Sequence, residues 1–159
     1  MYESLKVWLE RRKLKLNEKK TRILDFRKES FEFLGFRLSS RRTRNKRTYV
    51  HIEPSPKKLN EVRQAVREET TCSTLWKEPK VVFARVNQRV RGWSEYFHYG
   101  SSTKAFGDIQ GYVQNRMRRW LWRKHNRTRG HYTKSYDNDV LHEHYGLLKL
   151  PLYASWKHS

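Results

Sequence analysis

The densest run of cationic side chains lies between Asp108 and Asp137, and no acidic residue occurs between these two. Arginine suits RNA because its planar guanidinium grips phosphate and also stacks on bases. A helix face that is merely solvated usually mixes charges of both signs, and this run does not. We therefore predict RNA contact here rather than a solvated face. The side chains concerned are Arg116, Arg118, Arg119, Arg123, Lys124 and Arg127.

Two further basic groups invite the same interpretation. The first has no acid between Glu32 and Glu53, and its cations would repel one another unless an anion lay among them. We predict that it forms a basic loop that contacts phosphates, the alternative being a solvated loop. It comprises Arg41, Arg42, Arg44, Lys46 and Arg47. The second group, on the polar side of an expected helix, is Arg85, Arg89 and Arg91.

The composition supports an anionic partner. The 159 residues include 36 Lys and Arg against 16 Asp and Glu, which gives a net charge of +20. Nucleic acid is the leading candidate because each neutralised phosphate releases a counterion; an anionic membrane surface or an acidic protein is a weaker one. Aromatic residues make up 14% of the chain, which indicates a folded body. No apolar run is long enough to span a membrane and no signal-peptide core is visible, so we expect a cytoplasmic protein without a membrane partner.

The N-terminal third is expected to contain strands. Residues 21–27 and 31–38 alternate as strands do, residues 39–47 would be the basic loop, and residues 48–52 a third strand. Both faces of the segment 31–38 are apolar, which predicts that part of it is covered on both sides. Before these strands, residues 2–13 are expected to form a short amphipathic helix with Leu5 and Trp8 on one face.

Pro54 and Pro56 mark a boundary, after which helices dominate. Ser55 is a plausible N-cap for a helix over 56–69. A second helix opens at Pro79 and a third covers 103–124; residues 147–156 are expected to cover the bundle. Strands followed by helices predict an α+β fold. We expect two units, residues 1–53 and residues 54–159.

Three segments, in this order, resemble the C-terminal part of group II intron reverse transcriptases, the maturases. Residues 14–23 resemble the palm motif that follows the polymerase aspartates, with Lys20 at the place of its lysine. The sequence Phe33-Leu34-Gly35-Phe36 resembles the hairpin motif called the primer grip. Residues 85–97 resemble the maturase-specific signature. Its matching positions are Asn87, Gly92, Trp93, Tyr96 and Phe97.

The resemblance implies that residues 1–53 are the end of a polymerase palm and that residues 54–159 are the thumb and maturase domain. It implies structured intron RNA and the template–primer duplex as partners. Lys20 would lie near the incoming nucleotide, unless it is an ordinary solvated lysine. The primer-grip residues would support the primer backbone, with Gly35 allowing a close approach; the alternative is a plain core role. The aromatic signature residues are expected to be core, and Gly92-Trp93 to end their helix.

One departure from the family pattern limits the expected activity. The family holds two divalent ions with a Tyr-x-Asp-Asp turn and an earlier Asp, whereas the four aspartates here are scattered, at 25, 108, 137 and 139. We therefore expect no polymerisation by this chain alone, no metal site and no cofactor; Mg²⁺ would belong to a complete polymerase. The His and Asp near residues 137–144 are not taken as a metal site. Three hypotheses stay open: an RNA-binding maturase unit, one half of a split polymerase, or a degenerate remnant that binds nucleic acid generally.

Overall fold

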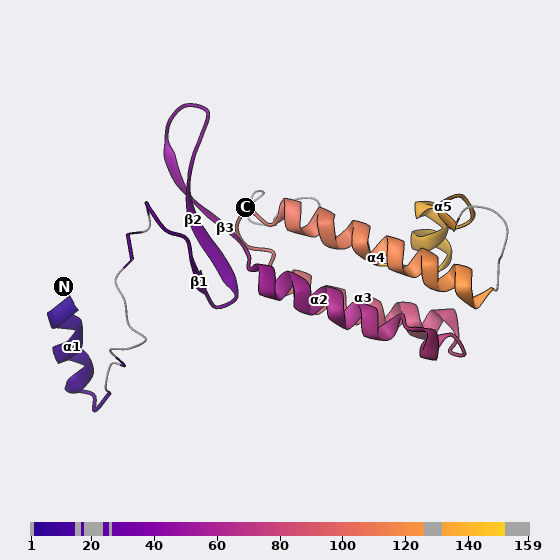
Figure 1. Ribbon diagram of the computed structural model, residues 1–159, viewed down its shortest axis with the longest axis horizontal. Coiled ribbons are helices and arrows are strands. Elements are labelled where there is room, and N and C mark those ends of the chain that lie inside the picture. The colour runs from indigo at the N-terminus through magenta and orange to yellow at the C-terminus, as the bar shows by residue number, and fades with distance from the viewer. Residues whose placement is uncertain (1, 15–16, 18–23, 26, 126–131, 152–159) are drawn as a thin grey trace.

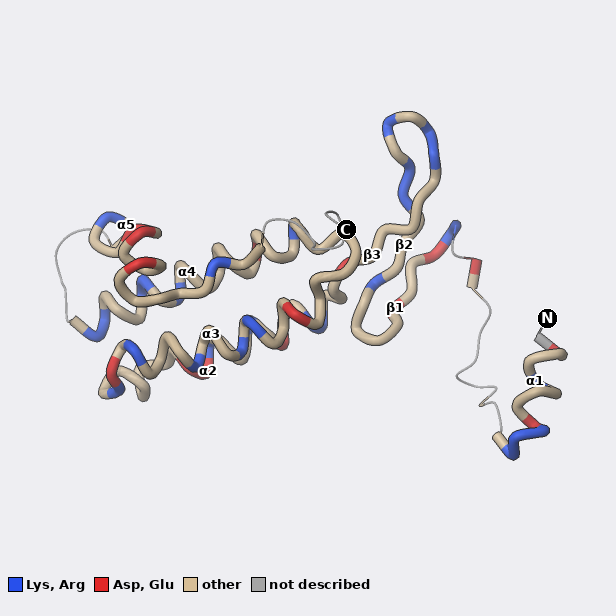
Figure 2. The backbone as a smooth tube through the Cα atoms, turned by 180° about the vertical axis from the view of Figure 1, so that it is seen from behind, with Lys and Arg blue, Asp and Glu red and all other residues tan. Residues whose placement is uncertain are grey.

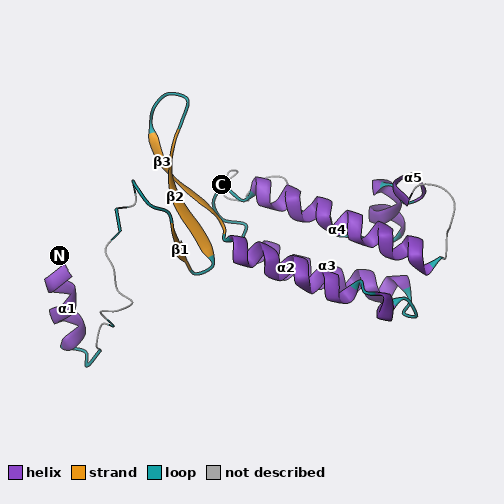
Figure 3. Ribbon diagram, viewed as in Figure 1, coloured by secondary structure: helices purple, strands orange, loops and turns teal. Residues whose placement is uncertain are grey.

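The computed structural model describes residues 2–14, 17, 24–25, 27–125 and 132–151 (Figure 1). A small antiparallel sheet lies at one end of an elongated bundle of helices, which confirms the α+β class (Figure 3). The first helix, α1 (Tyr2–Glu10), is shorter than the expected 2–13 and lies apart from the bundle. Its apolar residues Leu5 and Trp8 are about half exposed.

The sheet is built from β1 (Phe31–Phe33), β2 (Phe36–Arg42) and β3 (Thr48–Pro54), in the order β1-β2-β3. The prediction of one continuous strand over 31–38 is wrong. Leu34 and Gly35 have φ values of 48° and 81°, so the chain reverses there in a tight two-residue turn. The alternating apolar residues on either side of the turn mimic an uninterrupted strand.

The predicted basic loop over 39–47 is also shorter than expected. Strand β2 continues to Arg42 and pairs with Thr48 of β3, which leaves only residues 43–47 as the connecting turn. Thr43 closes that turn, because its N–H donates to Arg47 O at 2.8 Å and its carbonyl accepts from Lys46 N at 3.0 Å. The two strands project as a ribbon beyond the bundle (Figure 1), and we call residues 36–54 the arm. The predicted strand 48–52 is confirmed and extended.

Cross-strand partners divide the arm into two faces. Phe36, Leu38, Ile52 and Pro54 share the apolar face, and Pro54 is fully buried. Cover on both sides, as expected for 31–38, is not found, since Phe33 is 61% exposed.

Three hydrogen bonds fix the base of the arm, and the two-residue turn that precedes it, to the helices. Ser55 N donates to Gly35 O at 2.8 Å, and Ser101 N donates to Ile52 O at 2.6 Å. Tyr96 Oη donates to the carbonyl of Leu34 at 2.9 Å. The arm is therefore positioned at its base by α2, by the end of α3 and by the connection that follows α3.

Helix α2 (Pro56–Glu69) begins as predicted. The Ser55 hydroxyl accepts from Lys58 N, and Pro56 occupies the first turn, where its missing N–H has no helical partner to lose. Val62 and Val66 are buried against the bundle. A short 3-10 turn, η1 (Cys72–Thr74), then leads to the next helix.

Helix α3 (Pro79–Tyr96) carries the segment that resembles the maturase signature. It runs straight through Gly92-Trp93 to Tyr96, so the expected helix end at this pair is wrong. A glycine weakens a helix by only about 1 kcal/mol relative to alanine. The burial of apolar side chains before and after Gly92 contributes more than this cost. Val86 and Val90 are buried on the predicted stripe.

Helix α4 (Thr103–Lys124) matches its prediction at both ends. Its inward side chains form the centre of the core, again as predicted. They are Phe106, Ile109, Val113, Met117, Trp120 and Leu121.

The C-terminal part packs back on α4 through α5 (Tyr132–Ser135) and the π-helical turn η2 (Val140–His144). Leu147 and Leu150 are buried in the core, which confirms the expected cover for the described part; residues 152–156 lie outside it. Of the predicted strand 21–27, residues 21–23 and 26 lie outside the described residues. The carbonyl of Asp25 accepts from the N–H groups of Lys28 and Glu29, so the described residues here turn back on Asp25 and do not form a strand. None of the described helices is long and apolar enough to cross a membrane.

Candidate nucleic-acid interface

The cations predicted on α4 fall into two groups, and the first is bonded to the protein itself. Arg116 reaches the end of α2, where its Nη2 donates to Thr70 O and Thr70 Oγ1, both at 2.9 Å. Arg118 turns the other way and its Nε donates to Tyr136 O at 2.7 Å. Both guanidinium groups therefore hold neighbouring segments against α4. They have fewer free N–H donors for a ligand than the helical pattern of the sequence suggests.

Lys124 belongs to the same group. Its Nζ donates to the carbonyls of Leu75 and Lys77, both at 2.8 Å, and so closes the loop between α2 and α3. These carbonyls follow the end of η1, where the backbone lacks helical partners, and the ammonium satisfies two of them.

The second group on α4 consists of Arg119 and Arg123, which are exposed. Arg119 lies over the ring of Tyr132, with its Cζ 5.7 Å from the centroid, and Arg123 Nη1 is 3.7 Å from Cys72 Sγ. Among the described residues, neither side chain forms an ion pair with an acid. We call Arg119 and Arg123 the α4 surface.

The backbone carbonyls of Arg63 and Arg67 lie on the α4 side of α2. Tyr112 Oη donates to Arg63 O at 3.3 Å, and Arg116 Nη2 lies 3.5 Å from Arg67 O, so this stretch of α2 adjoins the basic helix. Arg67 is exposed.

The cations of the arm are all exposed. Figure 2 shows that most of them lie around the free end of the ribbon. Arg41 has a long ion pair, with 4.0 Å between its Nη2 and Glu53 Oε1. Arg37, near the base, bonds the Ser30 hydroxyl instead of an acid. Among the described residues, four more cations have no acidic partner: Arg42, Arg44, Lys46 and Arg47. They are concentrated at the free end of the ribbon, where like charges lie close together without compensation.

The arginines of α3 are partly neutralised. Glu69, at the end of α2, lies 3.7 Å from Arg85 Nη1 and also 3.7 Å from Arg89 Nη2. Both arginines are more than half exposed, so these pairs contribute little to stability. Arg91 is exposed and lies two residues beyond Arg89, towards the end of α3.

The signature residues act mainly as structural contacts. Asn87 Nδ2 donates to Gly146 O at 2.7 Å, and its Oδ1 accepts from Leu148 N at 2.9 Å, so the amide holds the C-terminal segment. Phe97 is buried beside Trp93, with ring centroids 5.4 Å apart, which confirms the expected core role.

Tyr96 is the exception among the aromatic signature residues, because it is 52% exposed. Its ring stacks on Phe36 at 5.7 Å, and its hydroxyl bonds the Leu34 carbonyl. The primer-grip-like turn is thereby fixed to the signature helix. Within that turn Phe36 faces the core, whereas Leu34 is 68% exposed, so a plain core role is wrong for it.

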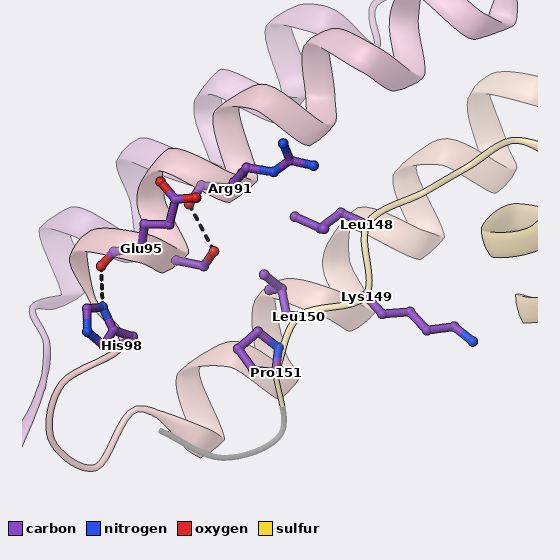
Figure 4. Close-up of a pocket in the computed structure, with 8 residues that line it drawn as sticks. Arg91, Glu95, His98, Leu148, Lys149, Leu150 and Pro151 are labelled. Atoms are coloured by element: carbon purple, nitrogen blue, oxygen red, sulfur yellow. Dashed lines mark hydrogen bonds between the residues drawn. The ribbon is translucent and has the colours of Figure 1, made fainter. Parts of the chain in front are cut away.

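A cleft of about 400 Å³ separates the end of α3 from the segment that Asn87 holds (Figure 4). Arg91, Glu95 and His98 line its helical side, and Leu148 and Leu150 line the other. Figure 4 shows the Lys149 side chain extending away from α3. The lining is mainly apolar.

The segment with His and Asp that the sequence left without a metal role makes ordinary hydrogen bonds. Asp137 Oδ1 accepts from Val140 N at 2.9 Å. His142 lies between Gln114 Nε2 at 3.0 Å and Leu147 O at 2.7 Å. Within the described parts of the chain, no three His, Cys, Asp or Glu residues are grouped as a metal ion would need. Lys20 and Arg127 lie outside the described residues.

The geometry thus presents an arginine-rich helical bundle with a basic arm at its base. Comparison with family models matches residues 59–136, from α2 to α5, to the group II intron maturase-specific domain. A comparison with curated proteins found no match. Residues 59–136 therefore match a group II intron maturase-specific domain, and this match implies a maturase role in RNA binding and splicing.

Proposed function

We propose that this maturase region grips structured intron RNA through two exposed basic surfaces, the α4 surface and the free end of the arm. The contacts would be to phosphates and to the shape of A-form helices, with arginine stacking on unpaired bases. Joined to a polymerase half, the same region would act as the thumb and hold the template–primer duplex. The exposed turn at Leu34-Gly35 would then lie against the primer backbone.

One observation carries the proposal. In an acid-free stretch of α4, three cations are already bonded to protein carbonyls, and only Arg119 and Arg123 remain exposed without an acid among the described residues. Arginines that face solvent with no compensating charge are suited to phosphate binding.

The test is RNA affinity as a function of salt. The double substitution Arg119→Gln and Arg123→Gln should weaken binding to a structured intron RNA by about tenfold or more and should lower the salt slope by about two, one unit for each lost phosphate contact. The matched control removes the same charge at the opposite end of the bundle, with Lys57→Gln and Lys104→Gln, two exposed lysines in the first turns of α2 and α4.

Equal losses in the two double variants would mean that only net charge matters, and the α4 surface would be rejected. Competition between structured RNA and duplex DNA at physiological salt separates a maturase from a degenerate remnant. A preference for the RNA supports the proposal, whereas equal affinities would favour a general basic nucleic-acid binder.

A second candidate is one half of a split RNA-directed DNA polymerase. The observation that favours it is α1, whose Leu5 and Trp8 are 48% and 50% exposed on a helix apart from the bundle. A separate chain with the catalytic aspartates would cover this apolar face. Adding such a chain should restore metal-dependent DNA synthesis, and Trp8→Glu should abolish complex formation while leaving RNA binding unchanged. Persistent inactivity with no complex formed would reject this candidate.

A further inference from the structure

The polar face of the arm borders a cleft of about 370 Å³. The basic surfaces proposed above as RNA contacts do not include this cleft. One wall is the polar face of β2 and β3, and the other is the turn that precedes β1. Arg37 joins the walls, because its Nη2 donates to Ser30 Oγ at 3.3 Å. The cleft lies on the face of the sheet opposite Phe36 and Pro54, which pack towards the helices.

Positive charge exceeds negative charge around this cleft. Its lining includes four cations, Arg27, Lys28, Arg37 and Arg41, against the two carboxylates of Glu29 and Glu53. The ion pairs that the cations form here are weak, with 4.0 Å between Lys28 Nζ and Asp25 Oδ2 and the same distance between Arg41 Nη2 and Glu53 Oε1. An anion in the cleft would relieve the remaining repulsion.

Two guanidiniums converge on the cleft although they are four residues apart in β2. Arg41 leans along the strand towards Glu53, and Glu53 is the cross-strand partner of Arg37. Ser39 lies between the two arginines on the same face. Guanidinium groups converging beside serine hydroxyls provide the donors that tetrahedral oxyanions accept.

A buried histidine on this face supplies an independent observation. His51 is 91% buried and pairs in register with Ser39. Its Nε2 lies 3.2 Å from Glu53 Oε2 and forms a hydrogen bond with that carboxylate. Its Nδ1 is buried and has no hydrogen-bond partner among the described residues. His51 does not line the cleft itself, but its contact with Glu53 holds that carboxylate beside Arg37 and Arg41.

We propose that the cleft binds one backbone phosphate of the RNA, held between Arg37 and Arg41 with the serine hydroxyls beside it; this inference rests on the proposed RNA-binding function. Arg42 does not take part, because neighbouring residues of a strand point to opposite faces. The arm thus offers two kinds of contact, a defined phosphate site at its base and a diffuse basic tip.

A double-mutant cycle on the full chain tests the site. Arg37→Gln and Arg41→Gln should each weaken binding of a short structured RNA about tenfold and lower the salt slope by about one. Because both would remove the same phosphate contact, the double variant should lose much less than the product of the two effects. In the matched control, Arg41→Gln is combined with Arg42→Gln. The two losses of RNA affinity should multiply, because Arg42 lies on the other face of the arm.

Three outcomes would overturn the site while the wild-type chain still binds RNA. The first is multiplicative losses for Arg37→Gln with Arg41→Gln, together with a slope lowered by two. The second is no loss in either single variant whose circular dichroism shows an intact fold. The third is binding of inorganic phosphate, by titration calorimetry, that both substitutions abolish without changing RNA affinity, which would assign the cleft to free phosphate. If wild type fails to bind RNA, the proposed function itself fails.

Discussion

Asn87 binds the backbone on both sides of Leu147: its amide nitrogen donates to the carbonyl of Gly146, and its amide oxygen accepts from the N–H of Leu148. An asparagine can do this because one side chain carries both a donor and an acceptor. The segment it holds inserts Leu147 and Leu150 into the core. A residue of the maturase signature therefore closes the bundle.

Asn87→Ala should lower the free energy of unfolding by about 2 kcal/mol, because two polar backbone groups lose their partner and the buried leucines lose their tether. Chemical denaturation measures this. Gln88→Ala, at an exposed neighbouring position, should change stability by less than about 0.5 kcal/mol. Equal effects of the two substitutions would contradict the role given to Asn87.

Arg118 and Arg119 are adjacent in sequence but should respond differently to substitution. Arg118→Gln should cost about 1–2 kcal/mol of stability, because the Tyr136 carbonyl loses a charged donor. Arg119→Gln should leave stability nearly unchanged and should weaken RNA binding about threefold to tenfold. Thermal unfolding and RNA titration on the same two proteins separate the effects, and a reversed pattern would refute this division.

The contact between Tyr96 and Leu34 should be separable into ring and hydroxyl. Tyr96→Phe keeps the ring against Phe36 but removes the hydrogen bond to the Leu34 carbonyl, so it should cost only about 0.5–1 kcal/mol. Tyr96→Ala removes both and should cost clearly more. Hydrogen exchange of the amides in β1 and β2 should rise in the same order; unchanged exchange in both variants would mean that Tyr96 does not hold the hairpin.

Gly100 and Gly107 form a matched pair for backbone strain. Gly100 has a φ of 79°, and an added Cβ would lie 2.7 Å from Ile52 O, so Gly100→Ala should destabilise by about 2–4 kcal/mol. Gly107 lies inside α4 with open space around it, so Gly107→Ala should stabilise by about 0.5–1 kcal/mol. If Gly107→Ala lowered the stability instead, helix propensity would not be the main determinant of stability at position 107.

The helices could be predicted well because local signals coincide. The cap at Ser55, the proline at 79 and the apolar stripe of α4 each place an end or a face without any long-range contact. The resemblance to the primer-grip hairpin was right about residues 33–36, whereas the prediction of one strand from periodicity was wrong. Apolar alternation has the same period in a strand and in two strands joined by a two-residue turn. Only the positive φ values of Leu34 and Gly35 separate them, and a Leu at the first of these positions gives no warning.

The basic residues could be found from the sequence, but their individual roles could not. Charge runs identify which segments are cationic, whereas the structure decides which cations reach carbonyl groups of their own chain. Arg116 and Arg119 look alike in the sequence. One is directed to Thr70, forty-six positions away in the chain, and the other to solvent, and only the packing of α2 against α4 determines this difference.

The three hydrogen bonds at the base of the arm have an energetic consequence. Ser101 is bonded to the arm at Ile52, and Tyr96 is bonded to Leu34 in the turn that precedes the arm. The contacts that orient the arm therefore also hold the end of α3 and the connection between α3 and α4. A ligand that binds only the ordered arm stabilises the folded state by mass action, by about 2.7 kcal/mol at a hundred times its Kd. If RNA binds the arm as proposed, it should also stabilise the helical bundle against unfolding.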